Sequence, residues 1–124
     1  SGSLSKIGWI LKDCIFCKIA NNVIDVNKVY ENKDLIAFND MNPQAPFHIL
    51  IIPKKHISTI NDIENTDKRL IGELFIAAKK IAYKNKISDS GYRLIFNCNE
   101  NGGQTVFHIH LHMLAKRKMS WPPG

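Results

Sequence analysis

Three of the five histidines in this 124-residue chain, His108, His110 and His112, fall within five residues, and single apolar residues separate them. In a β-strand successive side chains point to opposite faces, so this alternation places the three imidazoles on one face and the apolar residues on the other. Side chains two positions apart on a strand are about 6 to 7 Å apart, close enough to act on one small group. Residues 106–114 therefore predict a half-buried strand with a chemically active face.

Three roles are open to this histidine row. The first is purely structural, which is common for one histidine but demands partners for two ring nitrogens in each of three. The second is a metal site, since neutral imidazole is a standard zinc ligand. The third is nucleophilic or acid–base chemistry, because histidine changes charge closest to neutral pH. The residues that flank the row bear on this choice.

Two glycines, Gly102 and Gly103, come shortly before the histidine row. Glycine lets the backbone approach a ligand closely, and a loop with successive N–H groups can form an anion-binding nest. A glycine pair by itself is more often a plain turn. Before a histidine row, in a chain with a formal net charge of +6, it favours a phosphate held against an imidazole.

The other apolar patterns predict the rest of a sheet. Residues 29–40 hold two short apolar stretches around the polar segment 31–34, which is typical of a hairpin. The apolar run 48–52 predicts a largely buried strand, and two prolines assign residues 41–46 to a loop. Residues 92–97 predict one more strand. With the histidine strand and one long helix, these elements indicate an α+β domain with a five-stranded, mainly antiparallel sheet.

The long helix is expected between about residues 66 and 86, where apolar residues recur at steps of four, three, one and three. Its lysines lie toward the other side, and we interpret them as a solvated surface. Asn65 or Thr66 is expected to cap the start of this helix, and Gly91 lies beyond its end.

The composition indicates one compact, soluble domain. Charges of both signs accompany 44% hydrophobic residues, and no apolar run approaches the roughly 20 residues of a membrane span. The three cysteines cannot all pair within one chain, and no signal-peptide pattern is seen, so we expect a reduced intracellular setting. We interpret residues 1–13 as a mobile N-terminal arm that begins with a cloning remnant, and residues 14–124 as the folded domain.

Several segments together resemble the histidine triad (HIT) superfamily. The histidine triad signature is matched by GGQTVFHIHLHML, and the Hint branch, the histidine triad nucleotide-binding proteins, by CIFCKI, AFNDMNPQAP, HILIIPKKHI and the terminal WPPG. A match in so many parts, over roughly residues 14–124, is far more specific than a short motif. It implies the HIT-like fold, with one long helix, a short N-terminal helix and a homodimer in which two sheets join into ten strands. The expected location is the cytoplasm, with the nucleus as a further one.

The resemblance implies a purine nucleoside phosphoramidase, which hydrolyses the P–N bond of adenosine or guanosine 5′-monophosphoramidates. The middle histidine, His110, is then the nucleophile and forms a nucleotidyl-histidine that water cleaves. His112 is expected to bind the phosphate oxygens or the bridging atom, His108 to support its neighbours, and His48 to belong to the relay behind the nucleophile. Thr105 stands where the family usually has serine, and its β-branch limits the rotamers of a hydroxyl expected to assist leaving-group protonation.

The nucleotide contacts are likewise implied by the resemblance. The Asp40 carboxylate suits a bidentate grip on the ribose hydroxyls, and Met41 is expected beside the base. Phe16, Ile24 and Phe38 are expected to form walls of the base pocket, although such residues are more often plain core. The residues that correspond to the phosphate site are Asn97, Gly103, Gln104, Thr105, His110 and His112.

Cys14 and Cys17 have zinc-ligand spacing, but a tetrahedral site needs two more ligands. In histidine triad proteins with this pair, the other two ligands correspond to His56 and His108. We therefore expect a structural zinc site, and we disfavour a redox pair because its usual strand-to-helix context is absent. No cofactor is expected in catalysis, because the nucleophile is a histidine.

The C-terminal segment 121–124, Trp-Pro-Pro-Gly, has two interpretations. Tails rich in proline and glycine are generally frayed ends. The resemblance instead implies that Trp121 and its neighbours reach the active site of the partner subunit and influence the choice of leaving group.

Other functions compete with the phosphoramidase. A dinucleoside polyphosphate hydrolase and a deadenylating DNA-repair enzyme belong to the same superfamily, and the WPPG end disfavours both. The DNA-repair enzyme is disfavoured further, because this sequence shows no appended zinc finger or other DNA-binding module. A nucleotide-binding adaptor with little turnover is a rival of another class, against which the intact HIHLH argues. Specific nucleic-acid binding is not expected, because the lysines are scattered and lack a stacking platform.

Overall fold

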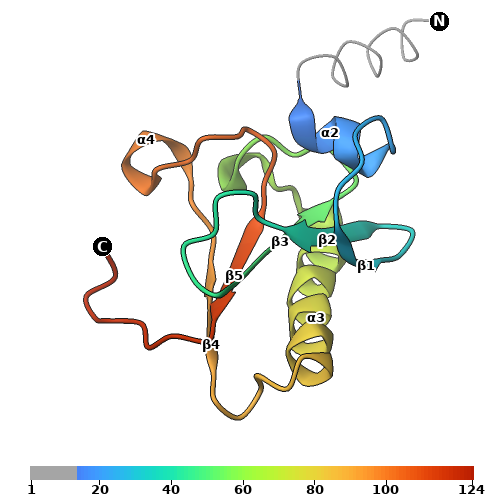
Figure 1. Ribbon diagram of the computed structural model, residues 1–124. Coiled ribbons are helices and arrows are strands. Elements are labelled where there is room, and N and C mark those ends of the chain that lie inside the picture. Colours follow the sequence, from blue (N-terminus) through green and yellow to red (C-terminus); the bar gives the residue numbers. More distant parts are fainter. Residues whose placement is uncertain (1–13) are drawn as a thin grey trace, which may run out of the picture.

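The computed structural model describes residues 14–124, so the expected N-terminal arm lies outside the described residues. Five strands form one antiparallel sheet in the order β1-β2-β3-β5-β4 (Figure 1). The strands are β1 (Lys28–Glu31), β2 (Leu35–Asn39), β3 (Phe47–Pro53), β4 (Tyr92–Ile95) and β5 (Leu111–Ala115). The helices are α2 (Ile15–Ala20), α3 (Lys68–Lys84) and α4 (Asn99–Gly102), with 3-10 turns η1 (Ile60–Asp62) and η2 (Asn65–Asp67). The expected α+β architecture is confirmed.

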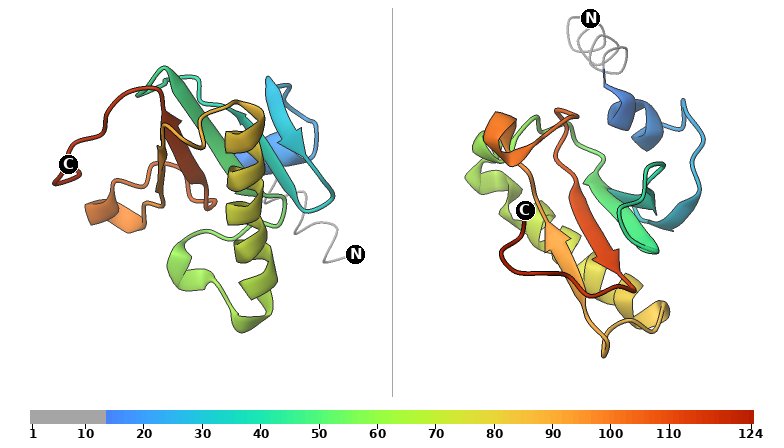
Figure 2. Two further views of the ribbon diagram at one scale, coloured as in Figure 1. Left: turned by 90° about the horizontal axis from the view of Figure 1, so that it is seen from below. Right: turned by 60° about the vertical axis from the view of Figure 1, so that its left-hand side comes forward.

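Helices cover the two faces of the sheet separately. Leu35 and Ala37 of β2 pack in a buried cluster with Leu74 and other residues of α3. Ile36 and Phe38, which alternate with them, pack on the opposite face against α2. Figures 1 and 2 show α3 running along the sheet, with α2 near the β1–β2 side. No described helix is both long and apolar enough to cross a membrane.

The long helix begins later than the sequence suggests. Asn65 and Thr66, the expected caps, lie in η2, and the residue that precedes α3 is Asp67. The Asp67 carboxylate does not cap α3, because it accepts hydrogen bonds from Lys55 Nζ at 2.6 Å and from the Glu64 N–H at 2.9 Å. These tertiary contacts displace the helix start by two residues.

The histidine strand is shorter than expected, because β5 begins only at Leu111. The preceding residues leave the ladder: the Ile109 N–H donates to the carbonyl of Ile57, in the segment that follows β3, at 2.8 Å. His108 and His110 therefore lie in the irregular segment that leads into β5, and only His112 lies within the strand. The rings of His110 and His112 still lie together, with centroids 4.9 Å apart, whereas the His108 ring lies against His56, with centroids 5.0 Å apart. Strand β4 also ends earlier than expected, at Ile95.

Candidate active site

A cavity of about 230 Å³ opens between α2 and the sheet face that α2 covers. It brings together many residues singled out in the sequence: Phe16, Phe38, Asp40, Met41, Thr105, His110 and His112. The other lining residues are Ile15, Ile19, Val26, Leu50 and Val106. An apolar wall and a polar edge thus share one cavity, an arrangement common at small-molecule sites.

The protonation of His110 follows from its single hydrogen bond. Its Nδ1 lies 2.8 Å from the carbonyl oxygen of His108, and a carbonyl only accepts, so Nδ1 carries the proton. In a neutral imidazole the other nitrogen then has a free lone pair. This Nε2 has no hydrogen-bond partner among residues 14–124, and His110 lines the cavity. His110 therefore offers an unprotonated nitrogen to whatever occupies the cavity.

His112 is arranged in the opposite way. The backbone N–H of Gln44 donates to His48 Nδ1 at 3.0 Å, so the proton of neutral His48 sits on Nε2. That Nε2–H donates to His112 Nδ1 at 2.9 Å, which leaves the proton of His112 on its own Nε2. His112 therefore presents an N–H donor beside the bare nitrogen of His110. His48 therefore contacts His112 and not His110, the histidine behind which the sequence analysis places it.

Burial keeps these imidazoles neutral. It lowers the pKa of His112 to about 4, and the neighbouring His110 and His48 add smaller contributions. Burial also lowers the pKa of His110, although the bond to the His108 carbonyl and the charge of Asp40 oppose it. The pKa of His48 is likewise lowered by burial, against Asp40. At neutral pH the site thus holds one neutral imidazole acceptor and one neutral imidazole donor.

Asp40 closes the polar edge of the cavity. One carboxylate oxygen accepts from the Asn42 N–H at 2.8 Å, and the other lies 3.4 Å from His48 Nε2. The residue is half-buried and lines the cavity, so its carboxylate can also reach a polar ligand there. Asp40, His48 and His112 hold ligand atoms within 4.8 Å of one another. Because His48 and His112 already bond each other, this trio acts here as a hydrogen-bonded network.

A second group of potential ligands lies next to this cavity: Cys14, Cys17, His56 and His108, called here the Cys–His cluster. The ligand atoms lie within 4.8 Å of one another, with His56 Nδ1 3.2 Å from both Cys17 Sγ and His108 Nδ1. Cys14 Sγ and Cys17 Sγ lie 3.4 and 3.6 Å from His108 Nδ1. Ligands around tetrahedral zinc are about 3.3 to 3.8 Å apart, given bonds of about 2.3 Å to sulfur and 2.0 Å to nitrogen. The donor set and its spacing fit zinc.

Outer contacts hold the cluster histidines in the orientation that a metal requires. His108 Nε2–H donates to the Pro53 carbonyl at 2.7 Å, which leaves Nδ1 bare and turned toward the thiols. His56 bonds the Ser58 hydroxyl through Nε2 at 3.1 Å. Burial lowers the pKa of His108 to about 4, so its ring is neutral at pH 7. Burial, with help from Cys14, raises the pKa of the Cys17 thiol to about 12, and a bound cation would reverse that preference.

The sequence and fold match known proteins. The family model described as "Scavenger mRNA decapping enzyme C-term binding" matches residues 13–121. An uncharacterized HIT-like protein of Buchnera aphidicola is 42% identical over 106 residues, 86% of this chain and 95% of that protein. The chain belongs to the histidine triad (HIT) family. Among solved structures, a HIT family hydrolase from Legionella pneumophila has 54% identity and a TM-score of 0.89, covering 90% of this chain and all of that one. A histidine triad nucleotide-binding protein from Candida albicans has 27% identity and a TM-score of 0.76, with coverages of 90% and 85%.

Not every residue expected at the site of this HIT protein lines the cavity. Gln104 is buried, and its amide is fully used: Oε1 accepts from the Asn99 N–H, and Nε2 donates to the carbonyls of Ser58 and Val106. The N–H groups of Gly103 and Gln104 close the end of α4, bonding the carbonyls of Glu100 and Asn99. The anion nest expected from the two glycines is therefore not formed. The remaining expected residues outside the cavity lining are Ile24, His48, Asn97, Gly103, His108 and Trp121.

The sequence patterns do not predict two parts of the HIT site. One is the N–H of Gln44, which fixes the proton of His48; a backbone group leaves no signal in a sequence. The other is the pair Ile15 and Ile19 of α2, which line the cavity together with Phe16. Their spacing of four places them on one side of a helix, a signal too short to interpret in a six-residue element.

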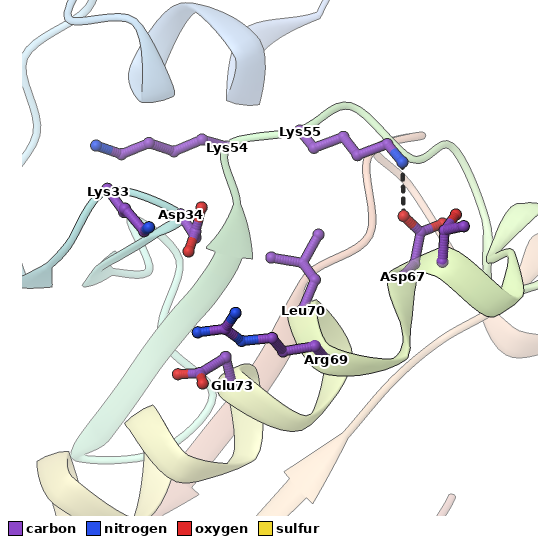
Figure 3. A pocket seen from close by; sticks show the side chains of 9 residues that line it. Lys33, Asp34, Lys54, Lys55, Asp67, Arg69, Leu70 and Glu73 are labelled. Carbon is purple, nitrogen blue, oxygen red and sulfur yellow. Dashed lines mark hydrogen bonds and ion pairs between the residues drawn. The ribbon is translucent and has the colours of Figure 1, made fainter.

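A larger groove of about 470 Å³, which no histidine lines, lies near the start of α3 (Figure 3). Two of its lysines form ion pairs: Lys55 Nζ lies 2.6 Å from Asp67, and Lys54 Nζ lies 2.8 Å from Glu31. Arg69 and Glu73 of α3 lie beside each other in Figure 3. None of the histidines lines this groove, whereas His110 and His112 line the smaller cavity, so the smaller cavity is the candidate active site.

Proposed function

We propose that this HIT protein is a purine nucleoside phosphoramidase of the Hint type, a nucleotide-binding hydrolase that cleaves the P–N bond of adenosine or guanosine 5′-monophosphoramidates. The observation that carries the proposal is the pairing of a bare His110 Nε2 with a protonated His112 Nε2 at one cavity. A nucleophile beside a hydrogen-bond donor is what displacement at phosphorus requires. The names of the HIT relatives, a hydrolase and a nucleotide-binding protein, support it.

In the first step His110 Nε2 attacks phosphorus, and the P–N bond breaks with its electron pair on the departing nitrogen. The amine leaves neutral after it takes one proton, and the new N–P bond gives a nucleotidyl-imidazolium that keeps its Nδ1–H on the His108 carbonyl. His112 donates its Nε2–H to a phosphoryl oxygen and stabilises charge in the transition state.

The proton for the amine comes from solvent, since the His48–His112 ladder holds no spare proton at neutral pH. Thr105 lines the cavity, and its hydroxyl is the group that passes this proton on. In the second step water attacks phosphorus, the N–P electron pair returns to His110 Nε2, and water gives up one proton. The products are the nucleotide and the regenerated imidazole.

The cavity walls suit the remaining parts of a purine nucleotide. Phe16 and Phe38 meet edge to face, with ring centroids 5.7 Å apart, and both line the apolar side where the base would lie. Asp40 sits at the polar edge, where its carboxylate would accept from the ribose hydroxyls. Met41 is 95% exposed and lies at the rim, where burial by a bound base would favour association.

The Cys–His cluster is proposed to hold structural zinc, bound by Cys14, Cys17, His56 and His108. Zinc supplies no chemistry to the reaction in this scheme; it would cross-link three separate segments of the chain. The cysteines are unpaired thiols in the described chain, which suits the reducing compartment of a cytoplasmic protein. Elemental analysis of unchelated protein should find one zinc per chain, and a value near zero would remove this part of the proposal.

The deciding experiment compares the wild type with His110→Ala on a fluorogenic adenosine 5′-phosphoramidate. Loss of the nucleophile should lower kcat/KM by on the order of 10⁴-fold or more. The variant should still bind AMP, which titration calorimetry would show, because the cavity walls stay in place. Equal activity of the two proteins would overturn the mechanism. AMP binding with no turnover in the wild type would favour a nucleotide-binding adaptor.

A further inference from the structure

His108 belongs to two sites at once. Its imidazole Nδ1 is one of the four ligand atoms of the Cys–His cluster. Its backbone carbonyl accepts the Nδ1–H of His110 at 2.8 Å and so sets the orientation of the ring proposed to attack phosphorus. A change in the torsion angles of His108 that moves the imidazole in the cluster would also tend to move this carbonyl.

Phe16 makes a second bridge between the two sites. It lies between Cys14 and Cys17 in the sequence, so two metal-ligand positions flank it. Its buried ring packs edge-on against His108 and His110, with centroid distances of 5.9 and 5.0 Å, and it lines the cavity. The position of this wall therefore depends on how the two thiols are held.

Helix α2 does not hold itself in place. It has six residues, far fewer than an isolated helix needs to be stable in water. Cys14 precedes its first turn, and Cys17 lies within it, while His56 follows β3 and His108 precedes β5. Binding of one ion to all four would therefore tie α2, with its cavity residues Ile15, Phe16 and Ile19, to the central strands.

We infer that the Cys–His cluster and the nucleotide cavity are thermodynamically coupled, with Phe16 and His108 as the positioning residues, so that zinc tightens nucleotide binding and nucleotide tightens zinc binding. The inference rests on the proposed function, because it takes a purine nucleotide as the cavity's ligand. Coupling free energies are reciprocal, so the two effects must have the same factor. We expect at least a fivefold effect, the lower end of common allosteric couplings.

Two measurements on the full chain test the coupling. Titration calorimetry gives the Kd of AMP for the zinc-loaded and the metal-free protein, with circular dichroism to verify that both are folded. The second measurement is the rate at which zinc-loaded protein releases zinc to excess chelator, with and without saturating AMP. The release measurement needs no stable metal-free protein, so it still tests the coupling if the metal-free protein unfolds. AMP should slow release at least fivefold.

A matched pair of variants tests the route. Phe16→Leu and Phe38→Leu both remove an aromatic wall of the cavity, but only Phe16 lies between two ligand positions and against His108. Both should bind AMP more weakly. Phe38→Leu should keep the slowing of zinc release by AMP, whereas in Phe16→Leu it should fall below about half of the wild-type factor.

The outcomes separate this inference from the proposed function. If AMP binds and leaves zinc release unchanged, the coupling is wrong and the phosphoramidase proposal is untouched. If the chain takes up no zinc, the same holds. If AMP does not bind at all, the proposed function fails, and the coupling fails with it. Equal behaviour of the two leucine variants would exclude Phe16 as the bridge.

Discussion

At the scale of single residues, the site depends on which nitrogen of each histidine carries its proton. Two backbone groups decide this: the His108 carbonyl for His110, and the Gln44 N–H, acting through His48, for His112. Periodicity alone predicts that the three histidines share one face, and the structure brings His110 and His112 together but places the His108 ring in the Cys–His cluster. The sequence predicts the position of the first two rings. It does not predict the protons, because backbone partners distant in the chain are set only by the fold. This is why the sequence analysis places His48 behind His110, whereas in the structure it contacts His112.

His48 should act by directing the proton of His112. His48→Leu removes the N–H that His112 Nδ1 accepts, so kcat should fall about 10- to 100-fold, the range common for such supporting contacts. His48→Gln can place an amide N–H where His48 Nε2–H stood, and it should recover most of this loss. AMP affinity should change little in either variant. Equal kcat values for leucine and glutamine would show that His48 is needed only for packing.

The acid limb of the pH profile should reflect the burial of His110. The nucleophile must be neutral, and burial lowers its pKa below the ordinary value of 6.5. Protonation, and with it the loss of kcat/KM, should therefore begin only as the pH falls below 6.5. Rates of phosphoramidate hydrolysis between pH 4.5 and 8, at constant ionic strength, would check this. A half-maximal kcat/KM at or above pH 6.5 would contradict a buried, neutral nucleophile.

At the scale of elements, hydrophobic periodicity predicts that a helix or strand is present better than it predicts the residues at which the element begins and ends. All five strands and α3 are present near the expected positions, because their apolar faces pack on each other. The ends differ where tertiary contacts intervene: Asp67 bonds Lys55 rather than capping α3, and the lead into β5 bonds Ile57. Such partners are distant in sequence, and no local sequence pattern predicts them.

The short helix α4 is the element that differs most from its prediction. The segment around Gly102 and Gly103 was expected to be an open phosphate loop. Gly103 instead has a φ of 77° and ends α4, a left-handed position at which glycine is favoured. A Cβ on Gly102 would lie 3.4 Å from the backbone of Asn97, an ordinary van der Waals contact. Gly103 therefore serves the fold of the loop by ending α4.

At the scale of the whole molecule, we propose that the free edge of β4 and the flank of α3 beside it form the interface of the homodimer that the sequence resemblance implies. Strand β4 pairs only with β5 in the described chain, and its four residues are half-buried. Phe75 of α3 is 44% exposed and packs against Phe96, with ring centroids 6.2 Å apart. An unpaired strand edge beside exposed aromatic surface favours association with a second copy.

Phe75→Glu should therefore weaken the dimer, because association would bury a charge without a partner in each subunit. We expect the dimer dissociation constant to rise at least about 100-fold, measured by light scattering or sedimentation over a concentration series. Lys80→Glu adds the same side chain at an exposed position of the same helix and is the matched control. A monomeric wild type, or equal dissociation constants for the two variants, would exclude this interface.

The C-terminal tail belongs to the same question. Arg93 of β4 donates to the Ser120 carbonyl at 3.0 Å and lies over the Trp121 ring, which is 81% exposed. Figure 1 shows the tail leaving the sheet on the side away from α2, and so away from the cavity of its own chain. If the tail affects the reaction, it should do so in a partner subunit. Deletion of residues 120–124 should then change relative kcat/KM across amine leaving groups by several-fold, with AMP binding preserved.

Mixed dimers distinguish whether the tail acts on the active site of its own chain or on that of the partner subunit. One chain carries His110→Ala with an intact tail, and the other has an intact His110 but lacks residues 120–124. In such a dimer the only site with an intact His110 lacks the tail of its own chain and can receive one only from its partner. Such dimers should show the leaving-group preference of the wild type, whereas dimers of two shortened chains should not. If the mixed dimers instead show the same leaving-group preference as dimers of two shortened chains, the tail acts within its own subunit.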